Sequence, residues 1–206
     1  MEAFYVLLFV ALIAGGIVVY RRGRKREAGA GGAPVGLPQA PAPEPVGGIE
    51  ARALKLGDIV NYEGRDYIVE GTLRFDQGGF RWQEHRLVDG EASLWLSVED
   101  DEGLEIAIWR RLRGVAVEPG AGTLEHGGVS YELDERGHAS FTSEGVTGAP
   151  GGGKAEFVDY ASGRRRLSFE RRGDDGGWEI SAGEIISEHA LDICPGSMER
   201  SSGKPG

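Results

Sequence analysis

Short runs of alternating apolar and polar residues, separated by glycine-rich turns, fill residues 50–194 and constrain the fold more than any other feature. Successive side chains of a strand point to opposite faces, so such runs are typical of strands with one buried face. Turns such as Glu63-Gly64 and Asp76-Gln77-Gly78-Gly79 are short enough to join antiparallel neighbours. Glycine accounts for 35 of 206 residues, which argues against a mainly helical protein. We therefore predict an all-β soluble domain that forms an antiparallel barrel or sandwich.

The segment 93–110 predicts a hairpin with a specific register. Its two strands place apolar residues on the same side of the sheet only if the loop has an odd number of residues. A three-residue loop, Asp101-Glu102-Gly103, satisfies this condition and puts glycine where a left-handed conformation is needed. The predicted pairs are Leu96 with Ile108, Val98 with Ile106, Trp95 with Trp109, and Glu99 with Glu105. Earlier in the chain, the same alternation predicts that Tyr67, Val69, Leu73 and Phe75 share a face.

A second passage of the chain resembles the first. Tyr67 in EGRDYIVEG corresponds to Tyr131 in GGVSYELDE, and WLSVEDDEGLEI (95–106) corresponds to RLSFERRGDDGGWEI (166–180). The spacing ranges from 64 to 74 residues, which requires gaps. This pattern predicts two similar β-units, at 50–115 and 116–196. The closing stretch 181–193 is compatible with a short helix or a final strand.

Three segments together resemble a bacterial family known as domain of unknown function 4178. They are LGDIVNYEGRDYIVEG (56–71), Gly-Phe-x-Trp-x-Glu (79–84) and WLSVEDDEGLEIAIW (95–109). The similarity spans about residues 54–194 and is strongest over 54–110. Members of this family have one or two copies of a β-rich unit, sometimes behind a membrane anchor. The second half departs from the pattern because Arg166 stands where the first copy has Trp95. The resemblance implies no catalytic residues.

Residues 3–20 carry no charged side chain and are followed directly by a basic cluster. At about 1.5 Å rise per residue they would form a helix of about 27 Å, close to the bilayer core. A cleavable signal peptide has its basic residues before the apolar stretch, so an atypical signal peptide is the weaker alternative. We predict a single-pass bacterial membrane anchor, with the N-terminus outside and the soluble domain in the cytoplasm. Basic residues at the membrane surface would be Arg21, Arg22, Arg24, Lys25 and Arg26.

The charge of the chain is strongly separated. Residues 1–26 carry a net charge of +4, whereas the whole chain carries −10. The remaining acidic part should be repelled by nucleic acid, so we expect no nucleic-acid partner. Residues 27–49 contain five of the nine prolines and predict a linker of Pro, Gly and Ala. Residues 197–206 are typical of a disordered tail.

The sequence lacks the motifs of common metal sites and nucleophilic enzymes. Its four histidines have no metal-binding spacing, and the single Cys194 excludes a cysteine cluster. Glu84 and His85 are adjacent on a strand, so they point to opposite faces and cannot form a dyad; we interpret both as solvated. The run 99–103 lacks the spacing of a calcium loop, and GAPGGGK (148–154) lacks that of a phosphate loop. We predict no cofactor, no metal and no enzymatic activity.

The tryptophans provide the one candidate interaction site. If the second face of the sheet is uncovered, Trp95 and Trp109, with Trp82 and Glu99 nearby, form a patch for a protein partner. If that face is covered, these residues belong to the core. The first alternative predicts a membrane-tethered, non-enzymatic binding or adaptor module. A different hypothesis is a small-ligand carrier, in which a β-barrel encloses one molecule at the inner membrane surface. An enzyme of unrecognised type is a third hypothesis.

Overall fold

The computed structural model describes residues 50–196, apart from residues 102, 116, 121, 174 and 175. The predicted anchor (3–20), its basic flank, the linker (27–49) and the tail (197–206) lie outside the described residues. Among the helices of the described ranges, none has the length and apolar character needed to cross a bilayer.

The described chain is almost entirely β-strand, with two short 3-10 turns. In chain order the elements are η1 (Ala51–Ala53), β1 (Ile59–Tyr62), β2 (Arg65–Gln77), β3 (Phe80–Asp89), β4 (Ala92–Asp100), β5 (Leu104–Leu112), β6 (Thr123–His126), β7 (Val129–Gly145), β8 (Gly152–Ser162), β9 (Arg165–Arg172), β10 (Glu179–Ile186), η2 (Glu188–Ala190) and β11 (Leu191–Cys194).

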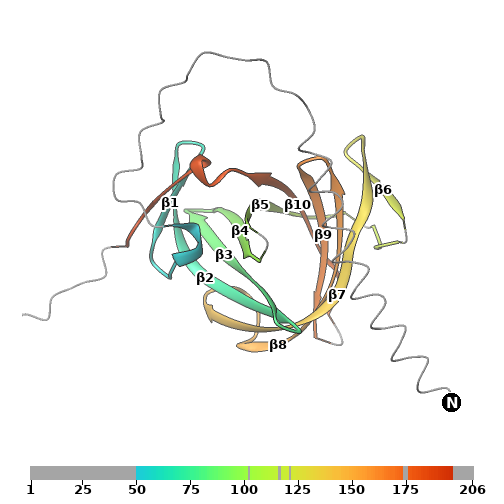
Figure 1. The fold of residues 1–206 in the computed structure, drawn as a ribbon, viewed down its shortest axis with the longest axis horizontal. Helices are drawn as coiled ribbons and strands as arrows, with labels where there is room; N and C mark the ends of the chain where they lie inside the picture. The colour runs from blue at the N-terminus through green and yellow to red at the C-terminus, as the bar shows by residue number, and fades with distance from the viewer. Residues whose placement is uncertain (1–49, 102, 116, 121, 174–175, 197–206) are drawn as a thin grey trace, which may run out of the picture. The chain divides into compact units, whose positions relative to one another are not determined.

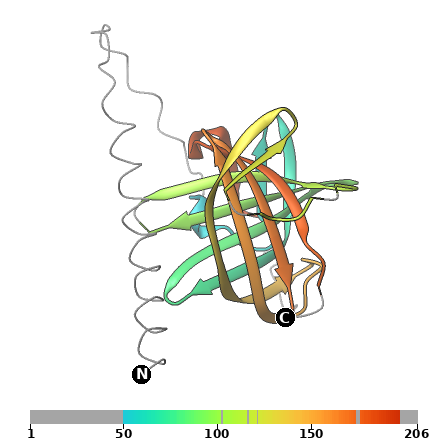
Figure 2. The same ribbon diagram turned by 90° about the vertical axis from the view of Figure 1, so that its right-hand side faces the viewer.

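The strands form one antiparallel sheet that closes into a barrel. The strand order is β11-β1-β2-β3-β4-β5-β10-β9-β8-β7-β6, and β2 also pairs with β7. That extra pairing, from Gly71 with Gly145 to Asp76 with Ser140, closes a ring of eight strands, from β2 through β5 and β10 back to β7. The closed ring is visible in Figures 1 and 2. Of the two predicted architectures, barrel and sandwich, the protein adopts the barrel.

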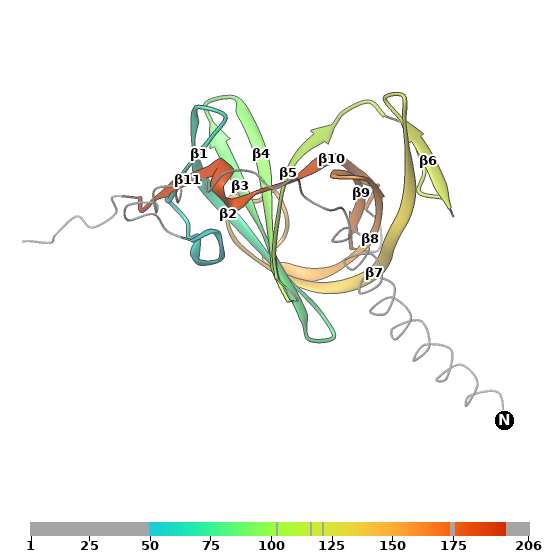
Figure 3. The same cartoon turned by 45° about the horizontal axis from the view of Figure 1, so that its top comes forward.

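Three short strands lie outside the ring. β1 pairs with the first residues of β2, β11 pairs with β1, and β6 pairs with the first residues of β7. Figure 3 shows β1 and β11 together on one side of the barrel and β6 on the other. The long strands β2 and β7 therefore have two parts, one that closes the barrel and one that supports a neighbouring strand.

The β4–β5 hairpin has the predicted register. Trp95 pairs with Trp109, Leu96 with Ile108, Val98 with Ile106, and Glu99 with Glu105. The loop is residues 101–103, and Gly103 has a positive φ of 142°. The buried aliphatic residues of one face of the hairpin belong to one core cluster: Leu94, Leu96, Val98, Ile106 and Ile108. This prediction is confirmed.

The predicted shared face of β2 is wrong, because a β-bulge interrupts the strand. Val69 pairs with Leu87 and Gly71 with Arg86, so Glu70 is the extra residue. An extra residue reverses the alternation of all side chains that follow it. Tyr67 and Val69 therefore belong to one core cluster, whereas Leu73 and Phe75 belong to another.

Apolar side chains form three clusters, and two of them lie on the outer face of the barrel. One lies between the outer face of β3–β5 and the segments η1, β1 and β11. Another lies between the outer face of β8–β10 and the chain from Leu112 to Leu133, which includes β6. The third cluster is inside the barrel and occupies only part of it, with Leu73, Phe75, Ala139, Phe141, Ala155 and Phe157 as its buried members.

The closing stretch 181–193, for which a helix or a strand was predicted, is mainly strand. Ser181 and Glu184 lie within β10, which pairs with β5 and β9. The chain then turns through η2, where Ser187 Oγ accepts a hydrogen bond from His189 N. The remaining residues form β11.

Candidate functional site

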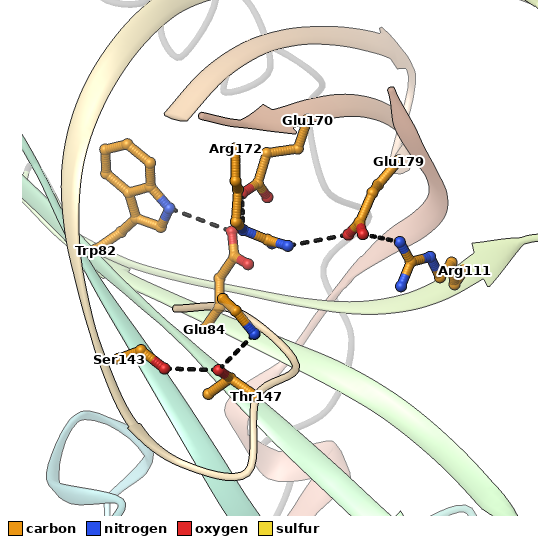
Figure 4. Close-up of polar contacts among 9 residues, drawn as sticks. Trp82, Glu84, Arg111, Ser143, Thr147, Glu170, Arg172 and Glu179 are labelled. Carbon is orange, nitrogen blue, oxygen red and sulfur yellow. Dashed lines mark hydrogen bonds and ion pairs between the residues drawn. The ribbon is translucent and has the colours of Figure 1, made fainter. Parts of the chain in front are cut away.

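Charged side chains meet inside the barrel. Glu84 on β3 interacts electrostatically with Arg172 and with Glu170, both on β9. β3 and β9 are four strands apart in either direction around the ring, so these side chains meet across the interior. Figure 4 shows them pointing toward one another between the surrounding strands. The interior acidic cluster, as we call it, consists of Glu84, Asp159, Glu170, Arg172 and Glu179.

One guanidinium group holds much of this cluster together. Arg172 Nε lies 2.6 Å from Glu170 Oε1, and Arg172 Nη1 donates a hydrogen bond to Glu179 Oε2 at 2.9 Å. Glu179 also forms an ion pair with Arg111 of β5. On the other side, Trp82 Nε1 donates a hydrogen bond of 3.3 Å to Glu84 Oε1.

Asp159 of β8 has one carboxyl oxygen without a partner. The Ser168 side chain forms a hydrogen bond with the carboxyl group. The Oδ1 atom is inaccessible to solvent and has no hydrogen-bond partner. A buried acceptor without a partner destabilises the folded state, because folding removes its hydrogen bonds to water and provides no others.

Burial makes these carboxyl groups hard to ionise. It raises the pKa of Glu84 to about 7, although the positive charge of Arg172 acts to lower this pKa. It likewise raises the pKa of Asp159 to about 7, and burial together with the Glu84 charge raises the pKa of Glu170 to about 8. Ordinary carboxyl groups titrate near pH 4, so the folded protein retains protons here that an exposed cluster would lose.

The accessibility of the cluster increases toward Arg111. The Glu170 and Arg172 side chains are 15% and 16% exposed, whereas those of Glu179 and Arg111 are 39% and 49% exposed. The ion pairs from Arg172 to Glu179 to Arg111 therefore lead from the interior toward solvent at the β5–β10 side.

Aromatic rings border the cluster on the β3 side. Trp82 stacks on Phe75 with the ring centroids 4.8 Å apart and contacts Phe157 edge-on at 5.7 Å. Phe80 lies 5.8 Å from Trp82 on the same strand. The interior thus combines flat apolar surfaces with carboxyl groups, a combination that suits binding of a small molecule. In the described part of the chain, no three His, Cys, Asp or Glu residues are grouped as metal ligands.

The predicted site residues Trp82, Trp95 and Trp109 face the barrel interior, not an open surface. Trp82 and Trp95 pack against the interior apolar cluster. Trp109 Nε1 donates a hydrogen bond of 2.9 Å to Ser97 Oγ, and its ring lies against Gly183. Glu99 is half-buried and pairs with Trp82 on β3 and Glu105 on β5. The predicted basic residues 21–26 lie outside the described residues.

Sequence reasoning missed most of the cluster. Glu84 and His85 do point to opposite faces, but the interpretation that both are solvated is wrong. Glu84 lies in the interior, and His85 is fully buried beside Thr72. The available signal was alternation: Ser168, Glu170 and Arg172 share one face of β9, opposite to the buried Leu167 and Phe169. Nothing in that pattern reveals that the polar face is enclosed.

The fold and the site define a closed β-barrel protein with an acidic and aromatic interior. The chain belongs to the family described as Domain of unknown function (DUF4178), which matches residues 55–188. It is 39% identical over 199 residues to uncharacterized proteins of Mycobacterium tuberculosis (Rv2597) and Mycobacterium bovis (Mb2628). These alignments cover 92% of this chain and 93% of each relative. No solved structure matches the chain.

Proposed function

We propose that this protein is a non-enzymatic binding module whose barrel interior holds a small molecule. The observation that carries the proposal is the placement of the apolar residues. Two of the three apolar clusters lie outside the barrel, whereas the interior contains partly accessible carboxyl groups beside aromatic rings. Stability alone would favour the reverse arrangement, because burying charged groups is costly. Barrels of eight strands are wide enough to hold one small ligand.

We also propose that the barrel is tethered to the cytoplasmic side of the membrane. The support comes from the uncharged residues 3–20 and the basic residues that follow them. The proline-rich linker at 27–49 would separate the barrel from the bilayer surface. Deletion of residues 3–20 should move the protein from the membrane fraction to the supernatant. A deletion variant that still sediments with membranes would contradict the tether.

A repeated unit is a further part of the proposal. The strands β1–β5 and β6–β10 occur in mirrored order within the sheet, which is the arrangement that two copies related by a twofold axis would give. Bulges interrupt both long strands, between Val69 and Gly71 and between Leu133 and Glu135. Tyr67 and Tyr131, which the sequence comparison aligned, are both buried just before these bulges. These correspondences support an origin by duplication.

Protein docking is a second candidate function, and a different surface favours it. The exposed large apolar side chains of the described residues are Leu56, Ile59, Ile68 and Val146. Ile59 and Ile68 are paired on β1 and β2, and Leu56 contacts Gly145, the residue before Val146. An adaptor role would therefore use this edge of the barrel and not the tryptophans. If a protein partner docks on this edge, Ile68→Ser should abolish its capture and Ile68→Val should retain it.

Native mass spectrometry of the full chain, released gently from membranes, tests the ligand-binding proposal. We expect a bound mass in the wild type and its loss in Trp82→Leu, because Trp82 borders the cluster. Trp178→Leu is the matched control, since Trp178 belongs to the outer cluster around Phe169. Equal retention of the bound mass by both variants, or its absence from the wild type, would contradict the proposal.

A further inference from the structure

The interior acidic cluster contains more carboxyl groups than cations. Glu84, Glu170 and Glu179 share the guanidinium of Arg172, and Arg111 pairs with Glu179. Asp159 interacts electrostatically with Glu170. Buried charges are tolerated when they are paired, so this excess requires either bound protons or an additional cation.

Asp159 identifies the type of group that is missing. Its Oδ1 atom is buried and has no hydrogen-bond donor. A carboxylate oxygen accepts hydrogen bonds, so the missing partner carries N–H or O–H groups. Asp159 also raises the pKa of Glu84, which places both carboxyl groups within electrostatic range of one another. A single bound cation between them would act on both.

The aromatic rings distinguish an organic cation from a metal ion. Trp82 presents its ring beside Glu84 and is held there by Phe75 and by the hydrogen bond from its Nε1 atom. Ammonium groups and their alkyl substituents bind favourably to such rings, and tryptophan is the best of them. The carboxyl groups are not arranged as metal ligands in the described residues.

We propose that the barrel interior binds a small organic cation with an N–H-bearing ammonium group, which donates to Asp159 and lies within the field of Glu84 and Glu170. This inference rests on the proposed ligand-binding function and specifies the class of ligand. The cation takes the place of protons that the cluster otherwise holds, so binding releases protons into solution near pH 7. It enters past Glu179 and Arg111, where the cluster is most exposed.

Titration calorimetry of the full chain in detergent tests the proposal with three probes of one shape. They are 2-phenylethylammonium, the neutral 2-phenylethanol and the anionic 3-phenylpropionate. We expect the ammonium probe to bind at least tenfold more tightly than the other two. Its measured heat should change between buffers of different ionisation enthalpy, because protons are released.

Asp159→Asn supplies the site-specific arm, since it removes the charge and keeps the shape. We expect at least a tenfold loss of affinity for the ammonium probe, and no loss for Asp192→Asn on the exposed face of β11. Circular dichroism checks that both variants fold, and Glu84→Gln replaces Asp159→Asn if that variant does not.

The possible failures are distinguishable. Equal or tighter binding of the alcohol or the carboxylate to the wild type overturns the proposal that the ligand is a cation, while the proposed ligand-binding function stands. Unchanged ammonium binding in Asp159→Asn overturns the assigned site. If no probe binds and no mass co-purifies with the full chain, both the cation and the proposed function are overturned.

Discussion

His85 is a fully buried residue whose protonation opposes folding. Its Nδ1 atom lies 3.0 Å from Thr72 Oγ1, and its Nε2 atom is buried without a partner. Burial lowers the pKa of His85 to about 4, assisted by the positive charge of Arg74. The imidazole is therefore neutral in the folded protein over most of the physiological range.

His85 should make the folded protein less stable in acid. The unfolded chain binds a proton on His85 near pH 6.5, whereas the folded protein binds it only near pH 4. This residue therefore lowers the free energy of unfolding as the pH falls between these values, by up to about 3 kcal/mol. Denaturant melts across pH 4 to 7 should show a smaller loss in Thr72→Val/His85→Leu, which replaces both partners. His138→Leu, on the exposed part of β7, is the control and should behave like the wild type.

The interior carboxyl groups have the opposite pH dependence. The unfolded chain loses the Glu170 proton near pH 4.5, whereas burial and Glu84 keep it in the folded protein up to about pH 8. Ionisation thus favours the unfolded state, and this contribution to stability is lost as the pH rises between these values. We expect Glu170→Gln to be more stable than the wild type at pH 8 and to show a flatter pH profile. Glu91→Gln, in the exposed β3–β4 turn, should leave the profile unchanged. A steeper profile in Glu170→Gln would contradict the buried-carboxyl account.

At the scale of single elements, the bulge in β2 decides which side chains enter the barrel. Glu70 has no partner on β3, and its carbonyl oxygen accepts a hydrogen bond from Val146 N. If the strand ran regularly through Glu70, without a bulge, Leu73 and Phe75 would share the outward face of Val69 and leave the interior apolar cluster incomplete.

Deletion of Glu70 should therefore leave the faces of the following residues unchanged, because Val69 and Gly71 then continue as neighbours opposite Leu87 and Arg86. We expect the deletion variant to keep a cooperative unfolding transition but to be less stable than the wild type, because it loses the hydrogen bond from Val146 N to the Glu70 carbonyl oxygen. Glu70→Gln keeps the bulge and loses only the exposed ion pair with Arg86, which is worth about 0–1 kcal/mol. Thermal melts followed by circular dichroism compare the two; a deletion variant without a cooperative transition would contradict the assignment of Glu70 as the extra residue.

The contact between β5 and β10 requires glycine at residue 183. A Cβ atom there would lie 2.4 Å from the Trp109 ring, which is too close for the ring to remain in place. We expect Gly183→Ala to cost about 1–3 kcal/mol and to change the tryptophan fluorescence. Gly177→Ala is the matched control, because a Cβ atom at that position meets no other atom within 4 Å. Equal stability of the two variants would show that Trp109 can move at little cost.

At the scale of the whole molecule, the two ends of the described chain hold each other in place. Ala51 N donates a hydrogen bond of 3.0 Å to Glu188 Oε1, and Gly196 N donates one of 3.1 Å to Asp58 Oδ1. β11 pairs with β1 and contributes Leu191 and Ile193 to the outer core cluster. The last strand of the chain is thus part of the support for the first.

Truncation after Ser187 should destabilise the barrel although it leaves all eight ring strands intact. It removes two buried aliphatic side chains and uncovers those beneath them, a loss of at least about 3 kcal/mol. Truncation after Gly196 removes only the tail and should not change the unfolding midpoint. Chemical denaturation of both shortened chains measures the difference, and equal midpoints would contradict the structural role of β11.

Features that depend on neighbours along the chain follow from the amino-acid sequence alone. Alternation and glycine turns predicted the strands, and the odd loop at 101–103 predicted the register of the β4–β5 hairpin. The sequence could not distinguish a barrel from a sandwich, because both require the same alternation. That choice depends on the pairing of β2 with β7, which are about seventy residues apart in the chain.

Which face of each strand is enclosed depends on contacts between strands that are distant in the chain. Glu84, Asp159, Glu170 and Arg172 have the positions of ordinary polar residues on half-buried strands. Closure of the ring brings them together from strands that do not neighbour one another, and burial then raises the carboxyl pKa values. The bulge at Glu70 could not be predicted either, because nothing in the sequence of β2 shows that its two parts pack into different apolar clusters. Within a regular strand, local periodicity indicates which residues share a face, but contacts distant in sequence determine whether that face meets water or other side chains.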